Sequence, residues 1–112
     1  MKKSSLITFA VILAVILLAV IVLTRSHPET SEEIAQCIGE NSVLYTQLGC
    51  HACKYQEDLF GENYKYLNVV DCFFEQDKCI QEEIRATPTW IIKGEKYVGA
   101  RSVEQLKELA GC

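Results

Sequence analysis

The chain begins with a long apolar segment. Residues 6–23 contain a single polar side chain, that of Thr8. As a helix they would extend about 27 Å, close to the ~30 Å hydrocarbon thickness of a bilayer. Lys2 and Lys3 precede the segment and Arg25 follows it. Because basic residues tend to stay on the cytoplasmic side, the two lysines predict a cytoplasmic N-terminus and an extracytoplasmic remainder. We therefore predict a single-pass membrane anchor over residues 1–25.

A cleaved signal peptide is the alternative interpretation of this segment. Its apolar region would be shorter, about 7–15 residues, and would end in small residues suited to cleavage. Here the segment ends in Val22-Leu23-Thr24, so the anchor is favoured. Both interpretations place the rest of the chain in an oxidising compartment, where cysteine pairs persist as disulfides.

After a linker and helix start at residues 26–33, the pattern predicts alternating helices and strands in one domain, residues 34–112. Helices are predicted where apolar residues recur every three or four positions, and strands where β-branched and aromatic residues cluster. The first helix is predicted to start at a capping box of Thr30 and Glu33 and to stop at Gly39, and the last helix to be capped by Ser102 and Gln105. Between them we predict strand 43–48, helix 51–60, strand 66–70, helix 78–85, strand 89–92, a turn at Gly94-Glu95 and strand 96–98. The predicted apolar face of helix 51–60 consists of Ala52, Tyr55, Leu59 and Phe60. This order predicts an α/β fold, with a four-stranded mixed sheet and helices on both faces.

The charge distribution excludes one class of partner. The formal net charge is −4, but Lys2, Lys3 and Arg25 belong to the N-terminal segment, which leaves eight basic and fifteen acidic residues in the remainder. An acidic domain without a basic stripe lacks the electrostatic signature of nucleic-acid binding. We expect no nucleic-acid partner.

The motif Cys50-His51-Ala52-Cys53 lies where a predicted strand meets a predicted helix. Unpaired backbone N–H groups at a helix start favour negative charge, and such surroundings lower a cysteine pKa from ~8.5 to between about 3.5 and 7.5. Cys53 follows one turn later on the same face, within reach of a disulfide with Cys50. This spacing predicts a redox pair in which Cys50 is the attacking thiolate and Cys53 the resolving thiol.

Two further features accompany the motif. A protonated His51 would stabilise the Cys50 thiolate and make the disulfide more oxidising; alternatively, it is a solvated residue at a helix start with little effect. Thr87-Pro88 opens a predicted strand, where proline cannot donate a hydrogen bond to the sheet. A cis bond there would turn the Thr87 backbone toward Cys50, although an ordinary trans bond fits the pattern as well.

The other four cysteines are Cys37, Cys72, Cys79 and Cys112. Six cysteines allow many pairings. If Cys50 pairs with Cys53, the simplest remainder is Cys72 with Cys79 and Cys37 with Cys112. We expect both to be structural, with an electron relay through Cys72–Cys79 as the alternative.

Several stretches together resemble the thioredoxin superfamily: residues 43–53, Ala86-Thr87-Pro88-Thr89-Trp90 and residues 99–106. More narrowly, residues 34–112 resemble the thioredoxin-like domain that accompanies bacterial and archaeal homologues of vitamin K epoxide reductase. This resemblance is carried by Ala35-Gln36-Cys37, residues 56–61, Val70-Asp71-Cys72 with Cys79, and Gly111-Cys112.

The resemblance implies a thioredoxin-like fold, a cis Thr87–Pro88 bond, and exchange of electrons between Cys50 and cysteines of substrate proteins. It also implies that a quinone-linked membrane oxidoreductase, a separate protein, reoxidises the pair. The Cys50–Cys53 disulfide is the redox group, and we expect no metal or other cofactor. Two departures stand out: Gly49 replaces the aromatic residue usual before the first cysteine, and Leu44 lies near the place of thioredoxin's buried acid. The missing acid favours an oxidant over a thioredoxin-like reductant.

Three other classes compete with this interpretation. A zinc module could use Cys50, Cys53, Cys72 and Cys79, but the second pair is widely spaced and a helix follows the first. A glutaredoxin-like reductase fits residues 45–50, but the anchor argues against it because glutathione reduction belongs mainly inside the cell. A redox-silent binding module would not require the intact CxxC motif.

Overall fold

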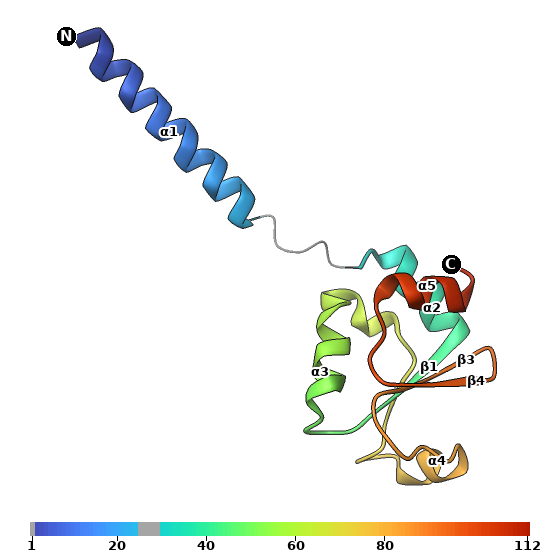
Figure 1. The fold of residues 1–112 in the computed structure, drawn as a ribbon. Helices are drawn as coiled ribbons and strands as arrows, with labels where there is room; N and C mark the ends of the chain where they lie inside the picture. Colours follow the sequence, from blue (N-terminus) through green and yellow to red (C-terminus); the bar gives the residue numbers. More distant parts are fainter. Residues whose placement is uncertain (1, 25–29) are drawn as a thin grey trace.

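The computed structural model describes residues 2–24 and 30–112. The apolar segment forms α1 (Lys2–Thr24), a single helix in which no residue is buried (Figure 1). Its length and composition are sufficient to cross a membrane. The hydroxyl of Thr8 donates a hydrogen bond to the Ser4 carbonyl within the helix, so this polar group does not need water. Arg25 and the predicted linker up to residue 29 lie outside the described residues.

The domain that follows has a four-stranded mixed sheet in the order β2-β1-β3-β4. Its elements are α2 (Glu32–Asn41), β1 (Ser42–Thr46), α3 (His51–Asp58), the 3₁₀ helix η1 (Gly61–Tyr66), β2 (Val69–Asp71), α4 (Gln76–Gln81), β3 (Thr89–Ile92), β4 (Glu95–Val98) and α5 (Val103–Ala110). β1 runs parallel to β2 and antiparallel to β3, which is antiparallel to β4. The predicted α/β class and mixed sheet are confirmed, and the arrangement is the thioredoxin-like fold.

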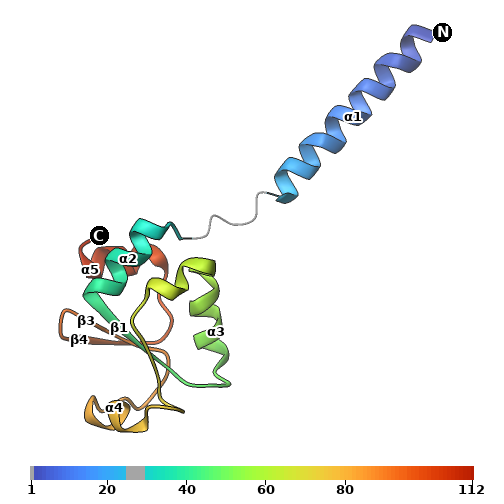
Figure 2. The same cartoon turned by 180° about the vertical axis from the view of Figure 1, so that it is seen from behind.

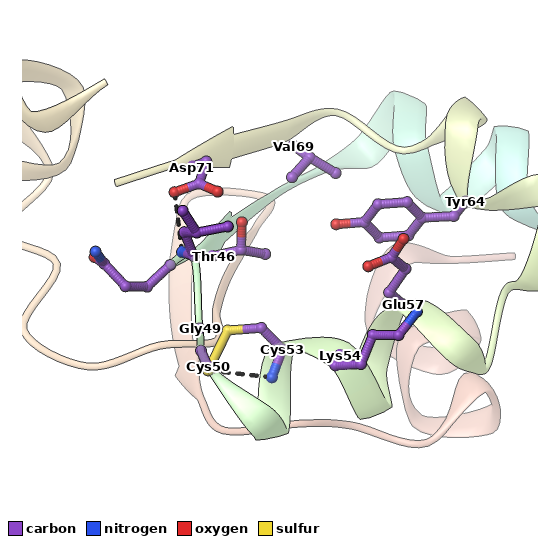
Figure 3. A pocket seen from close by; sticks show the side chains of 11 residues that line it. Thr46, Gly49, Cys50, Cys53, Lys54, Glu57, Tyr64, Val69 and Asp71 are labelled. Carbon is purple, nitrogen blue, oxygen red and sulfur yellow. Dashed lines mark hydrogen bonds between the residues drawn. A yellow bond between two sulfur atoms is a disulfide. The ribbon is translucent and has the colours of Figure 1, made fainter. Parts of the chain in front are cut away.

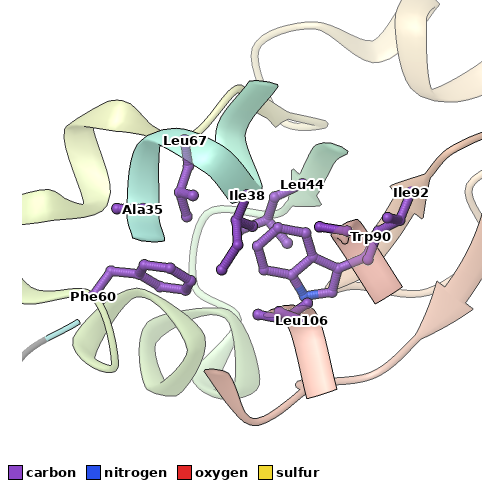
Figure 4. Close-up of a cluster of buried hydrophobic side chains, with 9 residues drawn as sticks. Ala35, Ile38, Leu44, Phe60, Leu67, Trp90, Ile92 and Leu106 are labelled. Atoms are coloured by element: carbon purple, nitrogen blue, oxygen red, sulfur yellow. The ribbon is translucent and has the colours of Figure 1, made fainter. Parts of the chain in front are cut away.

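Helices cover both faces of the sheet, α2, α3 and α5 on one side and α4 on the other (Figure 2). Side chains alternate between the faces along a strand, so the adjacent residues Leu44 and Tyr45 of β1 enter different clusters. Leu44 packs with Trp90 and Leu106 in the larger cluster, which also receives side chains from α2 (Figure 4). Tyr45 packs with residues of β2 and α4 in the smaller one.

The start and end of α2 differ from the predicted ones. The N-cap is Ser31, whose side chain accepts a hydrogen bond from the backbone N–H of Ile34. Thr30 instead donates its hydroxyl to the Leu59 carbonyl at 2.8 Å, which ties the domain start to the end of α3. The helix continues through Gly39, where a Cβ atom would collide with the backbone carbonyl of Tyr66. Gly39 is therefore a site of close packing, and its prediction as a helix stop was wrong.

The predicted apolar face of helix 51–60 is confirmed only in part: Phe60 is buried and Leu59 packs against the core. Ala52 and Tyr55 are exposed, whereas Cys53 and Gln56 are buried. The side-chain oxygen of Gln56 accepts hydrogen bonds from the Trp90 indole at 2.9 Å and the Arg101 backbone N–H at 2.7 Å. A buried polar group is stable when it is hydrogen-bonded, and an apolar periodicity cannot detect such a residue.

Other boundaries shift by a few residues. The β3–β4 turn is Lys93-Gly94, both with positive φ, rather than Gly94-Glu95. Such a pair matches the turn type whose twist suits a two-residue hairpin. Tyr66 belongs to η1, so β2 is shorter than the predicted strand, and α4 ends at Gln81.

Candidate functional site

A sharp turn after β1 places Cys50 at the start of α3. The backbone N–H of Cys50 donates to the Gln47 carbonyl at 3.1 Å, and Gly49 has a φ of +85°. Glycine adopts this left-handed conformation without steric cost. The turn thus accounts for a glycine at this position.

Cys50 is the N-cap of α3, and its sulfur is held by the backbone of the helix. The Cys53 N–H donates a hydrogen bond to Cys50 Sγ at 3.2 Å, and the two cysteines form a disulfide with a Cα–Cα distance of 5.2 Å. Cys50 is partly exposed, whereas Cys53 is 6% exposed. A sulfur at this end of a helix faces unpaired N–H groups that stabilise a thiolate. Attack from outside can therefore reach Cys50 more readily than Cys53.

The structure brings Thr87-Pro88 to the same place. The Thr87 carbonyl oxygen lies 3.6 Å from Cys50 Sγ, and the Thr87–Pro88 bond is cis, as the resemblance implies. Pro88 is buried, and its carbonyl accepts a hydrogen bond from the Gly99 N–H at 2.8 Å. The start of β3 is therefore fixed beside the disulfide.

His51 is the first residue of α3 and is exposed. Within the described residues its side chain makes no hydrogen bond or ion pair. Its effect on the Cys50 thiolate stays a prediction.

A hollow of about 390 Å³ adjoins the disulfide (Figure 3). Its walls come from β1, the following turn, α3, η1 and β2, and they include Cys50, Cys53, Glu57, Tyr64 and Asp71. The sequence predicted no site role for these two carboxylates. One signal was available for Glu57, which lies four residues after Cys53 and hence on the same helix face.

The carboxylate of Asp71 joins the two loops at this edge of the sheet. Its Oδ1 accepts hydrogen bonds from the Leu48 N–H at 3.3 Å and the Phe73 N–H at 2.8 Å. Burial, together with the negative charges of Glu57 and Asp71, raises the pKa of Tyr64 to about 12. Its phenol therefore stays neutral at ordinary pH.

The remaining cysteines form the two expected pairs. Cys37 is joined to Cys112 and Cys72 to Cys79, with Cα–Cα distances of 6.1 and 5.7 Å. The second disulfide closes the loop after β2, and β2 ends beside β1 because the two strands are parallel. Among residues 2–24 and 30–112, no three His, Cys, Asp or Glu side chains are grouped so as to hold a metal ion.

No protein-family model matches this sequence. Among solved structures, the chain is similar to an oxidised thioredoxin from Plasmodium falciparum, with 22% identity and a TM-score of 0.48, over 73% of this chain and 90% of that one. It is also similar to the N-terminal domain of the alkylhydroperoxide reductase AhpF from Enterococcus faecalis, with 15% identity and a TM-score of 0.46. That match covers 75% of this chain and 45% of the AhpF chain, so the present chain spans less than half of the AhpF domain.

Proposed function

We propose that this chain is a thiol–disulfide oxidoreductase that exchanges disulfides with cysteine-containing substrate proteins through Cys50 and Cys53. The observation that carries the proposal is the position of Cys50 Sγ, which accepts the Cys53 N–H at 3.2 Å and lies 3.6 Å from the Thr87 carbonyl oxygen. A helix start stabilises the thiolate that forms when the disulfide opens.

The reaction follows from the unequal exposure of the two sulfurs. A substrate thiolate attacks Cys50 Sγ, the Cys50–Cys53 bond breaks, and a substrate–Cys50 disulfide forms while Cys53 leaves as a thiolate. A second substrate thiolate then attacks the substrate sulfur and releases Cys50 as a thiolate. The substrate gains a disulfide, and Cys50 and Cys53 take up the two electrons.

The proposal also covers where the protein is located and which protein reoxidises its cysteine pair. α1 anchors the protein in a membrane with its N-terminus in the cytoplasm, and the domain works outside. A quinone-linked membrane oxidoreductase similar to vitamin K epoxide reductase, acting in trans, reoxidises the pair. This part rests on the sequence resemblance and the charge of Lys2 and Lys3. Quinone-depleted membranes should fail to reoxidise the reduced protein, and added quinone should restore the reaction.

The competing functions fit the site less well. The four cysteines of a zinc module are joined as two separate disulfides, Cys50–Cys53 and Cys72–Cys79. A glutaredoxin-like reductase would use glutathione, and an outward-facing domain argues for protein substrates instead.

The decisive experiment traps the intermediate. In the full-length membrane protein, Cys53→Ser should accumulate mixed disulfides with substrate proteins. They form when the Cys50 thiolate attacks a disulfide of another protein, and Cys53 is no longer present to resolve them. Non-reducing electrophoresis and mass spectrometry would locate them at Cys50. The matched control is Cys50→Ser, which should form none. Adducts on Cys72 or Cys79 would overturn the assignment.

The direction of electron flow has its own test. We propose that the protein is an oxidant, because the domain faces an oxidising compartment and Leu44 replaces a buried acid. Titration against glutathione should give a reduction potential between roughly −120 and −200 mV. A value near about −270 mV would indicate a reductant or isomerase.

A further inference from the structure

Cys53 must change its protonation state during the proposed reaction, and this inference rests on that proposed function. When the reduced pair is reoxidised, Cys50 first forms a mixed disulfide with the oxidant. Cys53 then attacks Cys50 Sγ, and thiolate is the attacking species. With 6% of its surface exposed, Cys53 contacts solvent only through the adjoining hollow, and water is a much weaker base than a carboxylate.

We propose that the carboxylate of Glu57 accepts the proton of Cys53 when Cys53 resolves a mixed disulfide on Cys50. The step balances: the Cys53 thiol gives its proton to Glu57, the Cys53 thiolate attacks Cys50 Sγ, and the partner leaves as a thiolate. The partner thiolate carries away the two electrons of the broken bond, and the Glu57 proton returns to solvent.

The helix supplies the geometry. Glu57 follows Cys53 by four residues in α3, so the two side chains are neighbours on one face, about 5–6 Å apart at their Cβ atoms. Both line the hollow beside the disulfide, and the Glu57 carboxylate points into it next to Tyr64 (Figure 3). A hollow of about 390 Å³ has room for several waters at ~30 Å³ each. A proton can therefore pass between the two groups without a direct contact.

The other groups that face the hollow are less suited to this role. Asp71 on β2 already accepts two backbone hydrogen bonds, from Leu48 and Phe73. Lys54, on the same helix, pairs with Asp58 at 3.0 Å and cannot accept a proton while charged. β1 contributes Thr46, which carries no charge.

Glu57 differs from these groups because its carboxylate is not tied to one partner, although the positive charge of Lys54 acts on it through space. In the described part of the chain it makes no hydrogen bond or ion pair. Its negative charge acts on Tyr64 of η1, which also lines the hollow, and contributes to the raised pKa of that phenol. The neutral phenol is available to hydrogen-bond the carboxylate as it gains and loses the proton.

The test uses one reagent to measure attack by Cys50 and resolution by Cys53 as separate steps. The full-length protein in detergent, mildly reduced at Cys50 and Cys53, is mixed with 5,5′-dithiobis(2-nitrobenzoate), and release of the coloured thiolate is followed by stopped flow. The first phase depends on reagent concentration and reports attack by Cys50. The second phase is independent of reagent concentration and reports resolution by Cys53.

Glu57→Gln should leave the first phase unchanged and slow the second by about 100-fold near neutral pH, the low end of what a positioned general base contributes. The difference should vanish above about pH 8.5, where a thiol ionises without help. Glu57→Asp should restore part of the rate. The control Glu62→Gln removes an exposed carboxylate from η1 that does not line the hollow, and should change neither phase.

Each outcome is informative. A second phase unaffected by Glu57→Gln across this pH range would overturn the role of Glu57 and leave the proposed function intact. Equal slowing at all pH values would also overturn it, since that result indicates a structural effect. A first phase that persists in Cys50→Ser would instead contradict the proposed function.

Discussion

The backbone N–H of Cys53 donates a hydrogen bond to Cys50 Sγ at 3.2 Å, so the second cysteine of the motif supports the first through its main chain. This contact exists because Cys50 is the N-cap of α3 and Cys53 is the third residue of the helix. Serine and threonine oxygens make the same contact at other helix starts. Here the acceptor is sulfur, which becomes a thiolate when the disulfide opens, so the contact favours the reduced pair.

His51→Ala should lower the reduction potential of the Cys50–Cys53 pair. A protonated imidazole next to Cys50 stabilises the thiolate and hence the reduced form, so its removal makes the disulfide harder to reduce. Titration against glutathione measures the shift. His51→Lys keeps a positive charge at the exposed helix start and should retain much of the original potential. An unchanged potential in His51→Ala would leave the helix N-terminus as the main source of thiolate stabilisation.

Loss of the Cys37–Cys112 disulfide should destabilise the domain strongly. The two residues are 75 positions apart, and closing a loop of this length is worth about 4 kcal/mol on the chain-entropy model. Cys37→Ala with Cys112→Ala should therefore lower the free energy of unfolding, measured by guanidinium denaturation in detergent. The comparison is Cys72→Ala with Cys79→Ala, which opens a much shorter loop and should cost about 2–3 kcal/mol. A larger loss in the second variant would contradict this account.

Gly39→Ala should destabilise the protein even though alanine favours helices. A Cβ at this position collides with the Tyr66 carbonyl, which is backbone and cannot move aside cheaply. Overpacking of this kind costs about 1–3 kcal/mol, more than the ~1 kcal/mol gained in helix propensity. Thermal unfolding followed by circular dichroism checks the loss. Glu40→Ala, an exposed neighbour in α2, should change stability by no more than about 0.5 kcal/mol.

The stability of the domain should fall between about pH 10 and pH 12. Tyr64 has its pKa raised to about 12 by burial and by the charges of Glu57 and Asp71, whereas an unfolded tyrosine titrates near ~10. In this window the unfolded chain loses the proton and the folded chain keeps it, so the stabilisation present below pH ~10 is lost as the pH rises. Tyr64→Phe should make the free energy of unfolding fall less steeply over this pH range. It should also remove the titration step that occurs at the highest pH in the tyrosinate absorbance. Tyr66→Phe, at an exposed phenol bound to Glu32, is the comparison and should have a smaller effect on stability.

The features of this protein that depend on local order could be predicted from the sequence. Eighteen consecutive residues with one polar side chain make a membrane-length helix. A β-branched and aromatic run followed by Gly49-Cys50 makes a strand that ends in a helix start. Ser102 and Gln105 form the predicted capping box at the start of α5, where both reciprocal hydrogen bonds are present. These features follow from residues within one or two turns of each other.

Which side chains meet across the sheet depends on contacts between distant segments, and these became known from the three-dimensional structure. Gln56 is polar, and its burial became clear only when Trp90 and Arg101, more than thirty residues away, supplied its hydrogen bonds. Gly39 resembled a helix stop until the Tyr66 carbonyl was found against it. Glu57 and Asp71 line one hollow because β2 pairs in parallel with β1, which brings the ends of both strands to the edge where Cys50 lies. Pairing across the sheet depends on the whole core, and a periodicity along the chain carries no information about it.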